Sequence, residues 1–175
     1  DLELEAIWNR VHSAKRDNSP LYLTLRNSEL CTAPLPSEHF FGREEEMYDL
    51  KELLLRGGKY LVCGLGGIGK TELLRQLIRW CEREGAAEQI AVVQYEESLV
   101  SSFSRSFLNL ESQDEQQRFH ESIYKLNKAG QKEKVVLFLD NMNRAEDADR
   151  EIAELKELPC TIFVTSRQEQ LEGFT

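Results

Sequence analysis

The chain has 175 residues, of which 41% are hydrophobic and 30% charged, a composition typical of an ordinary globular protein with one sizeable core. Its net charge of −9 argues against a general affinity for nucleic acid, because no basic excess offsets the repulsion by phosphates. No apolar run is long enough to cross a bilayer and no signal peptide begins the chain, so we expect a cytoplasmic protein without a membrane partner.

The N-terminal part of the chain has a pattern of its own. From residue 2 to about residue 16, apolar side chains recur at helical spacing: Leu4, Ile7, Trp8 and Val11. This predicts an amphipathic helix that packs on the domain or, alternatively, docks on a neighbouring one. Residues 17–20 end the helix with Asp-Asn-Ser-Pro, and the alternation over residues 21–26 is consistent with a short strand.

Residues 33–36, Ala-Pro-Leu-Pro, predict a stiff extended link and the best domain boundary in the sequence. We therefore expect an N-terminal extension over residues 1–39 and a domain over residues 40–175. The chain begins without Met and stops soon after an expected strand, so we expect it to be a piece of a longer protein.

Four cysteines are far apart in the chain, and no two of them form a C-x-x-C pair: Cys31, Cys63, Cys81 and Cys160. Cys63 and Cys160 lie in or beside apolar runs typical of strands, and Cys81 lies on the apolar face of an expected helix. We expect all four to be buried, reduced thiols, which also favours a cytoplasmic protein.

A glycine-rich stretch with Lys70 and Thr71 at its end lies between an apolar run, residues 60–63, and a helical pattern that ends at Gly85. It matches G-x-x-x-x-G-K-[ST] in the context of strand, loop and helix that this motif requires. Glycines let successive backbone N–H groups point at a phosphate chain, and the helix N-terminus favours negative charge. The residues expected to bind the phosphates are Gly64, Leu65, Gly66, Gly67, Ile68, Gly69, Lys70 and Thr71.

Strand and helix patterns alternate along the domain. The strands are expected at residues 60–63, 89–95, 135–139 and 161–165. The helices are expected after Gly42, after the glycine-rich stretch, after a cap at Ser98, over residues 112–129, and from a capping box of Asn143 and Glu146 up to Pro159. This pattern predicts an α/β fold, a three-layer sandwich with a mostly parallel sheet covered on both faces. It leaves the order of the strands open.

Asp140 ends the most apolar strand and is the candidate magnesium ligand together with Thr71. Ligands of parallel α/β sheets bind at the carboxyl ends of the strands, where both residues are expected. The alternative is an Asp that only caps a helix or turn. Asn141 follows, and its amide cannot act as the base that activates a water, so the sequence favours nucleotide binding over fast hydrolysis. Glu72, directly after Thr71, is included among the expected nucleotide-binding residues, although its acidic side chain is expected to point along the first helical turn.

Two arginines are further candidates. Arg167 follows the fourth strand, where its guanidinium could reach a γ-phosphate, although a surface arginine is the alternative. Arg43, with Phe41 and Gly42 beside it, could flank the base and ribose of a nucleotide. From the residues alone, an arginine that opens a helix is as consistent with a structural role.

Four stretches together resemble the nucleotide-binding domain of STAND-class P-loop ATPases, the NB-ARC/NACHT-like switches of apoptosome, plant-immunity and bacterial signalling proteins. They are FFGRE (residues 40–44), GLGGIGKT (64–71), VVLFLDN (135–141) and IFVTSR (162–167). The resemblance covers residues 40–175. It implies a switch that exchanges ADP for ATP with Mg²⁺ and then self-associates, under the control of other domains of the full-length chain.

By motif match, the resemblance implies that Phe41, Gly42 and Arg43 border the adenosine and that Asp140 holds the magnesium. It also implies that Arg167 senses the γ-phosphate. Three departures from the family pattern matter. Asn141 stands where many relatives have a second acid, the helical and winged-helix subdomains that close over the nucleotide are missing, and so are the effector and ligand-sensing regions.

Three alternatives are open. An AAA-like or kinase-like enzyme needs a catalytic base, which Asn141 does not supply. A GTPase is disfavoured because Asn127-Lys128-Ala129-Gly130 resembles N-K-x-D but lacks its Asp and follows a helix. A scaffold that binds no nucleotide is disfavoured because Lys70, Thr71 and Asp140 are all present.

Overall fold

The computed structural model describes residues 22–23, 30–31, 33–34, 36–143 and 149–175. The helix expected over residues 2–16 lies outside the described residues. The described elements are β1 (Tyr22–Leu23), β2 (Ala33–Pro34), α2 (Glu44–Arg56), β3 (Lys59–Cys63), α3 (Lys70–Glu84), β4 (Gln89–Gln94), α4 (Leu99–Ser106), α5 (Glu115–Gly130), β5 (Val135–Asp140), α6 (Asp149–Lys156) and β6 (Thr161–Ser166). The four expected core strands are therefore confirmed, each within one residue at either end.

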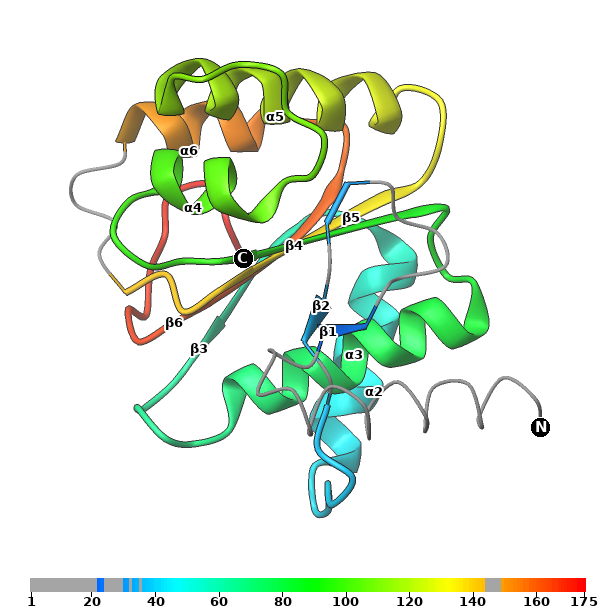
Figure 1. The fold of residues 1–175 in the computed structure, drawn as a ribbon. Coiled ribbons are helices and arrows are strands. Elements are labelled where there is room, and N and C mark those ends of the chain that lie inside the picture. The colour runs from blue at the N-terminus through cyan, green and yellow to red at the C-terminus, as the bar shows by residue number, and fades with distance from the viewer. Residues whose placement is uncertain (1–21, 24–29, 32, 35, 144–148) are drawn as a thin grey trace, which may run out of the picture.

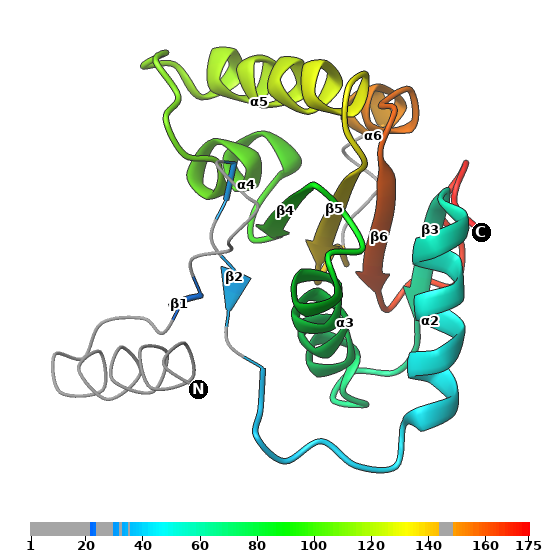
Figure 2. The same ribbon diagram turned by 90° about the vertical axis from the view of Figure 1, so that its right-hand side faces the viewer.

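The four core strands form one parallel sheet in the order β3-β6-β5-β4. Strand β6 thus lies between β3, which leads into the glycine-rich loop, and β5, which ends at Asp140. Helices α2 and α3 cover one face of the sheet, and α4, α5 and α6 cover the other (Figures 1 and 2). The expected three-layer α/β fold is confirmed.

Alternate residues of the buried strands point into two separate cores, as the period of two in a strand requires. On one face, Phe138 and Phe163 stack with ring centroids 5.7 Å apart and pack against the apolar stripes of α2 and α3. On the other face, Leu137 and Val164 pack against α4, α5 and α6, where Phe119 is fully buried. Strands β5 and β6 are buried at every position, as expected for central strands of a covered parallel sheet.

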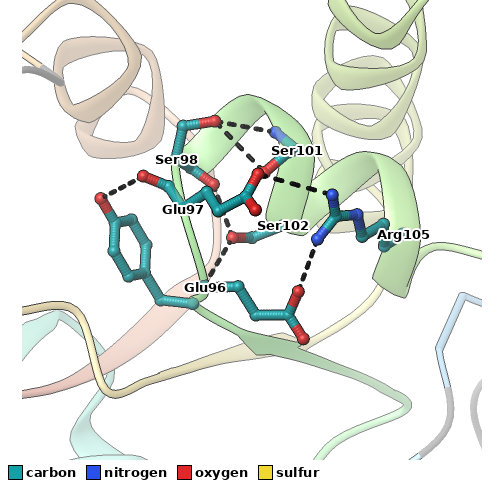
Figure 3. A network of polar contacts seen from close by, with 7 residues as sticks. Glu96, Glu97, Ser98, Ser101, Ser102 and Arg105 are labelled. Atoms are coloured by element: carbon teal, nitrogen blue, oxygen red, sulfur yellow. Dashed lines mark hydrogen bonds and ion pairs between the residues drawn. The ribbon is translucent and has the colours of Figure 1, made fainter.

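Helix α4 begins where Ser98 caps it, as expected. The Ser98 hydroxyl accepts a hydrogen bond from the backbone N–H of Ser101 at 3.1 Å (Figure 3). The Arg105 guanidinium lies 2.6 Å from the Glu96 carboxylate and 3.5 Å from that of Glu97. Both carboxylates that follow β4 are therefore paired with a cation on the next helix.

Helix α5 begins at Glu115, so the expectation of a start near Ser112 was wrong. Asp114 is the cap, because its carboxylate accepts from the backbone N–H of Gln117 at 3.0 Å. The backbone N–H of Ser112 instead donates to the Glu121 carboxylate at 3.3 Å, which holds this segment outside the helix.

Part of the expected N-terminal extension packs into the domain. Strands β1 and β2 pair antiparallel, so the stretch expected as a plain link contributes two residues to a strand. The carbonyl of Leu30 accepts a hydrogen bond from the backbone N–H of Leu108 at 2.8 Å. The backbones of Cys31 and Phe107 form an isolated antiparallel β-bridge. Leu30 and Cys31 are both buried in the core beneath α4 and α5.

Three of the four cysteines are buried as expected, and burial raises their thiol pKa values to about 12 for Cys31 and Cys81 and about 11 for Cys160. The expectation for Cys63 was wrong, because this thiol is exposed. It is the last residue of β3, which pairs with β6 on one side only, while Thr175 bonds the other edge of β3 near its start.

Within the described residues, every helix is too short or too polar to cross a membrane.

Candidate functional site

The loop between β3 and α3 curls around the Lys70 side chain. Gly67 and Gly69 have positive φ angles of 79° and 93°, which side chains rarely tolerate, and α3 begins directly after Gly69. The Lys70 ammonium donates to the carbonyls of Gly64 and Leu65 at 2.6 and 2.9 Å. The positive end of α3, the loop N–H groups and this ammonium together favour an anion.

A pocket of about 280 Å³ opens beside this loop. Its lining comes from the loop, the first turns of α3, and the carboxyl ends of β5 and β6: Gly66, Gly67, Gly69, Lys70, Thr71, Glu72, Arg75, Asn141, Thr165 and Arg167. Seven of these ten are candidates named from the sequence as nucleotide ligands, and Asn141 was singled out as the missing base. Arg75 and Thr165 were missed.

Three hydrogen-bonded side chains connect strands β5 and β6 with helix α3 at the carboxyl ends of the strands. The Thr71 hydroxyl donates to Asp140 Oδ1 at 3.1 Å, and the Thr165 hydroxyl donates to the same oxygen at 2.5 Å. Asp140 and Thr165 are buried, with 5% and 1% of their surfaces exposed. A hydroxyl and a carboxylate side by side are the oxygen donors that Mg²⁺ prefers, so Thr71 and Asp140 fit this ion. Thr165 could have been suspected from its place as a polar residue at the end of a buried strand.

The turn after β5 is bonded to the end of β6. Asn141 has a positive φ of 67°, and its backbone N–H donates to the Thr165 hydroxyl at 2.7 Å. Its side-chain Oδ1 accepts from Asn143 Nδ2 at 2.6 Å, and Asn143 Oδ1 accepts from the backbone N–H of Arg167 at 2.9 Å. The expected capping role of Asn143 is not seen in these contacts, and its expected partner Glu146 lies outside the described residues.

The Arg167 guanidinium lies against the glycine-rich loop. A methyl group placed on Gly66 would come within 3.1 Å of Arg167 Cζ, so a larger residue here would require the guanidinium to shift. The side chain is exposed and lines the pocket. The structure thus brings Arg167, Lys70 and Thr71 to one pocket, as the sequence predicted.

The candidates near the start of α2 lie beside the loop and outside the pocket lining. Arg43 Nη2 donates to the carbonyl of Ile68, and Arg43 Nη1 lies 3.4 Å from Glu46. Phe41 is 81% exposed and stacks on His39 with ring centroids 6.4 Å apart. Gly42, between Phe41 and Arg43 in the chain, has a positive φ of 73°. This geometry leaves Phe41 open to a ligand or another domain, while Arg43 contacts the loop backbone.

Glu72 is held by the segment that precedes α2. Its Oε1 accepts from the backbone N–H of Ser37 at 2.6 Å and from Gln76 Nε2 at 3.0 Å. Gln76 Nε2 also donates to the Ser37 carbonyl at 2.9 Å. Glu72 and Gln76, on one face of α3, thus bind the backbone N–H and the carbonyl of Ser37. Glu72 lines the pocket, but its carboxylate is engaged with Ser37 and Gln76 outside the pocket and lies 3.9 Å from Arg75 within the lining.

A family model for the AAA ATPase domain matches residues 39–161, which include the loop, Asp140 and most of the sheet. This chain belongs to the AAA ATPase domain family. No curated protein matches it. Among solved structures, the Walker-type ATPase of Pyrococcus abyssi superposes with a TM-score of 0.52 at 21% identity, over 75% of this chain and 47% of that one. The likeness shows the fold alone, and the chain spans about half the length of that protein.

Membership in the AAA ATPase family implies an adenine nucleotide and, in most members, Mg²⁺. The donor set of this AAA ATPase domain fits both, since the loop N–H groups, Lys70 and Arg167 suit phosphates and the Thr71–Asp140 pair suits the metal. The segment that resembles N-K-x-D, residues 127–130, lies in α5 and is not part of the pocket lining.

Proposed function

We propose that this AAA ATPase domain is the nucleotide-binding module of a STAND-type signalling switch. It binds ADP and ATP with Mg²⁺, hydrolyses ATP slowly or not at all, and uses nucleotide exchange to control its conformation. In the full-length protein, this exchange governs contacts with other domains and self-association. Nucleic acid and membranes are not its partners, and it works in the cytoplasm.

In this proposal each group of the site has a role. The loop from Gly64 to Thr71 binds the phosphates, with the Lys70 ammonium at the β- and γ-positions. Thr71 and Asp140 hold Mg²⁺, which neutralises phosphate charge when it is bound. Arg167 contacts the γ-phosphate. Phe41, Gly42 and Arg43 border the base and ribose, and Glu72, at the start of α3, belongs to the same site.

The observation that carries the proposal is that none of the residues described by the structure places a free carboxylate where a water would be activated. Asn141 occupies the position after Asp140, and an amide cannot take up a proton near neutral pH. Among the described residues that line the pocket, Glu72 is the one with a carboxylate, and Ser37 and Gln76 engage it. At the same sheet edge, Glu96 and Glu97 are paired with Arg105 (Figure 3).

The test is calorimetric titration of the chain with ADP, ATP and GTP in Mg²⁺, after removal of co-purified nucleotide. We expect binding of both adenine nucleotides, weak or absent binding of GTP, and little turnover. Lys70→Ala should abolish binding with the fold intact, because it removes the charge at the phosphates. Lys128→Ala, on the exposed surface of α5, should leave binding unchanged. Unchanged affinity in Lys70→Ala would overturn the site assignment.

A working AAA-type ATPase is the second candidate, favoured by the family match and by the presence of the Glu72 carboxylate in the pocket lining. Rapid turnover that Glu72→Gln removes would support this candidate, with Glu72 as the base. Absence of any nucleotide binding by the unmutated chain would instead favour a scaffold.

A further inference from the structure

Asn143 lies outside the pocket but contacts two residues that line it. Its Nδ2 donates to Asn141 Oδ1 at 2.6 Å, and its Oδ1 accepts from the backbone N–H of Arg167 at 2.9 Å. Both ends of the amide are therefore used, one toward the turn after β5 and the other toward the end of β6.

The backbone N–H of Arg167 fixes which end of the Asn143 amide donates and which end accepts. A backbone N–H only donates, so Arg167 requires the oxygen of the Asn143 amide to face it. The Asn143 nitrogen then points to Asn141, which must present its own oxygen. The Asn141 Nδ2 group has no hydrogen-bond partner among the described residues, and Asn141 lines the pocket. Asn143 thus leaves Asn141 with a free donor.

The shape of the turn itself depends on other contacts. The backbone N–H of Met142 donates to the Thr165 carbonyl at 2.9 Å, and the Ser166 hydroxyl donates to the Met142 carbonyl at 2.6 Å. Met142 is 1% exposed, so its side chain anchors the turn in the core. The turn therefore has contacts that do not involve Asn143, whose two hydrogen bonds act on the side chain of Asn141 and the backbone of Arg167.

We propose that Asn143 is a positioning residue that aims the Asn141 amide nitrogen and Arg167 at the terminal phosphate of ATP. This inference rests on the proposed function of the pocket as an adenine nucleotide site. Two donors aligned on the γ-phosphate, an amide N–H and a guanidinium, favour ATP over ADP because ADP offers them no acceptor. The turn after β5 thus sets which nucleotide the domain retains.

The experiment measures the ratio of ATP to ADP affinity by calorimetry, with a non-hydrolysable ATP analogue as a second ligand. We expect Asn143→Ala to weaken ATP binding about tenfold or more while ADP binding changes less than about twofold, since a hydrogen bond to a charged group is lost only with ATP. Asn143→Asp keeps the acceptor for Arg167 and loses the donor to Asn141, so it should also lower the ratio.

Ser166→Ala is the matched control, because it removes two hydrogen bonds, to the Met142 carbonyl and from the backbone N–H of Gln168, without touching Asn141 or the Asn143 amide. It should lower the melting temperature and leave the ATP-to-ADP ratio unchanged. Asn143→Ala added to Asn141→Ala should cost less than in the unmutated chain, because its partner is already absent.

Equal losses of ATP and ADP affinity in Asn143→Ala and Asn143→Asp, or no loss in either, would overturn the inference while leaving the nucleotide site in place. Failure of the unmutated chain to bind either nucleotide would instead overturn the proposed function on which it rests.

Discussion

At the scale of single residues, the position after Asp140 has the largest chemical consequence. Asn141 adopts a positive φ of 67°, a conformation that Asn and Asp tolerate better than other side chains. An aspartate there would have the same size and could accept the same hydrogen bond from Asn143 Nδ2. Replacing the Asn141 amide by a carboxylate of the same size would therefore place a potential base beside Asp140, the candidate magnesium ligand.

We expect Asn141→Asp to raise the rate of ATP hydrolysis by about 10²-fold, the lower end of what a positioned general base supplies. Release of phosphate under single-turnover conditions measures this rate. Asn109→Asp is a matched control, because Asn109 also has a positive φ, 56°, but lies between α4 and α5 away from the pocket lining. If the two variants hydrolyse ATP equally, the attacking water is not beside residue 141.

The cysteines allow a second test at this scale. Cys63 is exposed, while burial raises the pKa values of the thiols of Cys31 and Cys81 to about 12 and of Cys160 to about 11. Only the thiolate reacts fast, so an aromatic disulfide reagent should modify one thiol per chain near neutral pH and four after denaturation. Cys63→Ser should reduce the native count to zero. A native count above one would contradict the burial of the other three.

At the scale of elements, the segment before α2 is attached to the site at two places. Ser37 is bracketed by Glu72 and Gln76 of α3, and Arg43 donates to Ile68 in the glycine-rich loop. The glycine-rich loop and the first turns of α3 are thus both hydrogen-bonded to the segment that precedes α2.

We expect Gln76→Ala to release this segment, because it removes the hydrogen bonds to both Ser37 and Glu72. Amide hydrogen exchange over residues 37–43 should become faster, with little change in β5. Gln131→Ala removes a comparable hydrogen bond, to Asn127 at the end of α5, and should leave this exchange unchanged. Equal protection of these amides from exchange in the native chain and in Gln76→Ala would show that the hydrogen bonds of Gln76 do not hold the segment.

At the scale of the whole molecule, one sheet separates two cores. Phe163 is fully buried against α2 and α3, and Phe119 is fully buried against α4 and β5 on the other face. Because β5 and β6 contribute side chains to both cores, loss of packing on either side weakens the same strands. The domain should therefore unfold as one cooperative unit.

We expect Phe163→Ala and Phe119→Ala each to lower the free energy of unfolding by about 3–5 kcal/mol. Circular dichroism and tryptophan fluorescence should follow coincident transitions in both variants. Tyr124→Ala, on α5 with 64% of its side chain exposed, should change stability by less than about 1 kcal/mol. Two separate transitions in either variant would show that the faces unfold independently.

Most of the secondary structure could be predicted because its signals are local. The four core strands, the glycine-rich loop and the Ser98 cap depend on residues within a few positions of one another. The start of α5 was misplaced, because Glu121, nine residues further along, takes the backbone N–H of Ser112. Cys63 was misjudged, since an apolar run does not reveal whether its strand lies at an edge.

The sequence by itself determined the α/β class, the phosphate-binding motif and the chemical types of its ligands, because periodicity and glycine conformations act along the chain. Only the tertiary structure decided that β6 lies between β3 and β5, since strand order results from contacts distant in sequence. That order places Thr165 against Asp140 and lets Asn143 join Asn141 to Arg167. Hydrogen bonds between residues more than twenty positions apart have no local signal, so the arrangement that orients the site emerges only when the sheet is assembled.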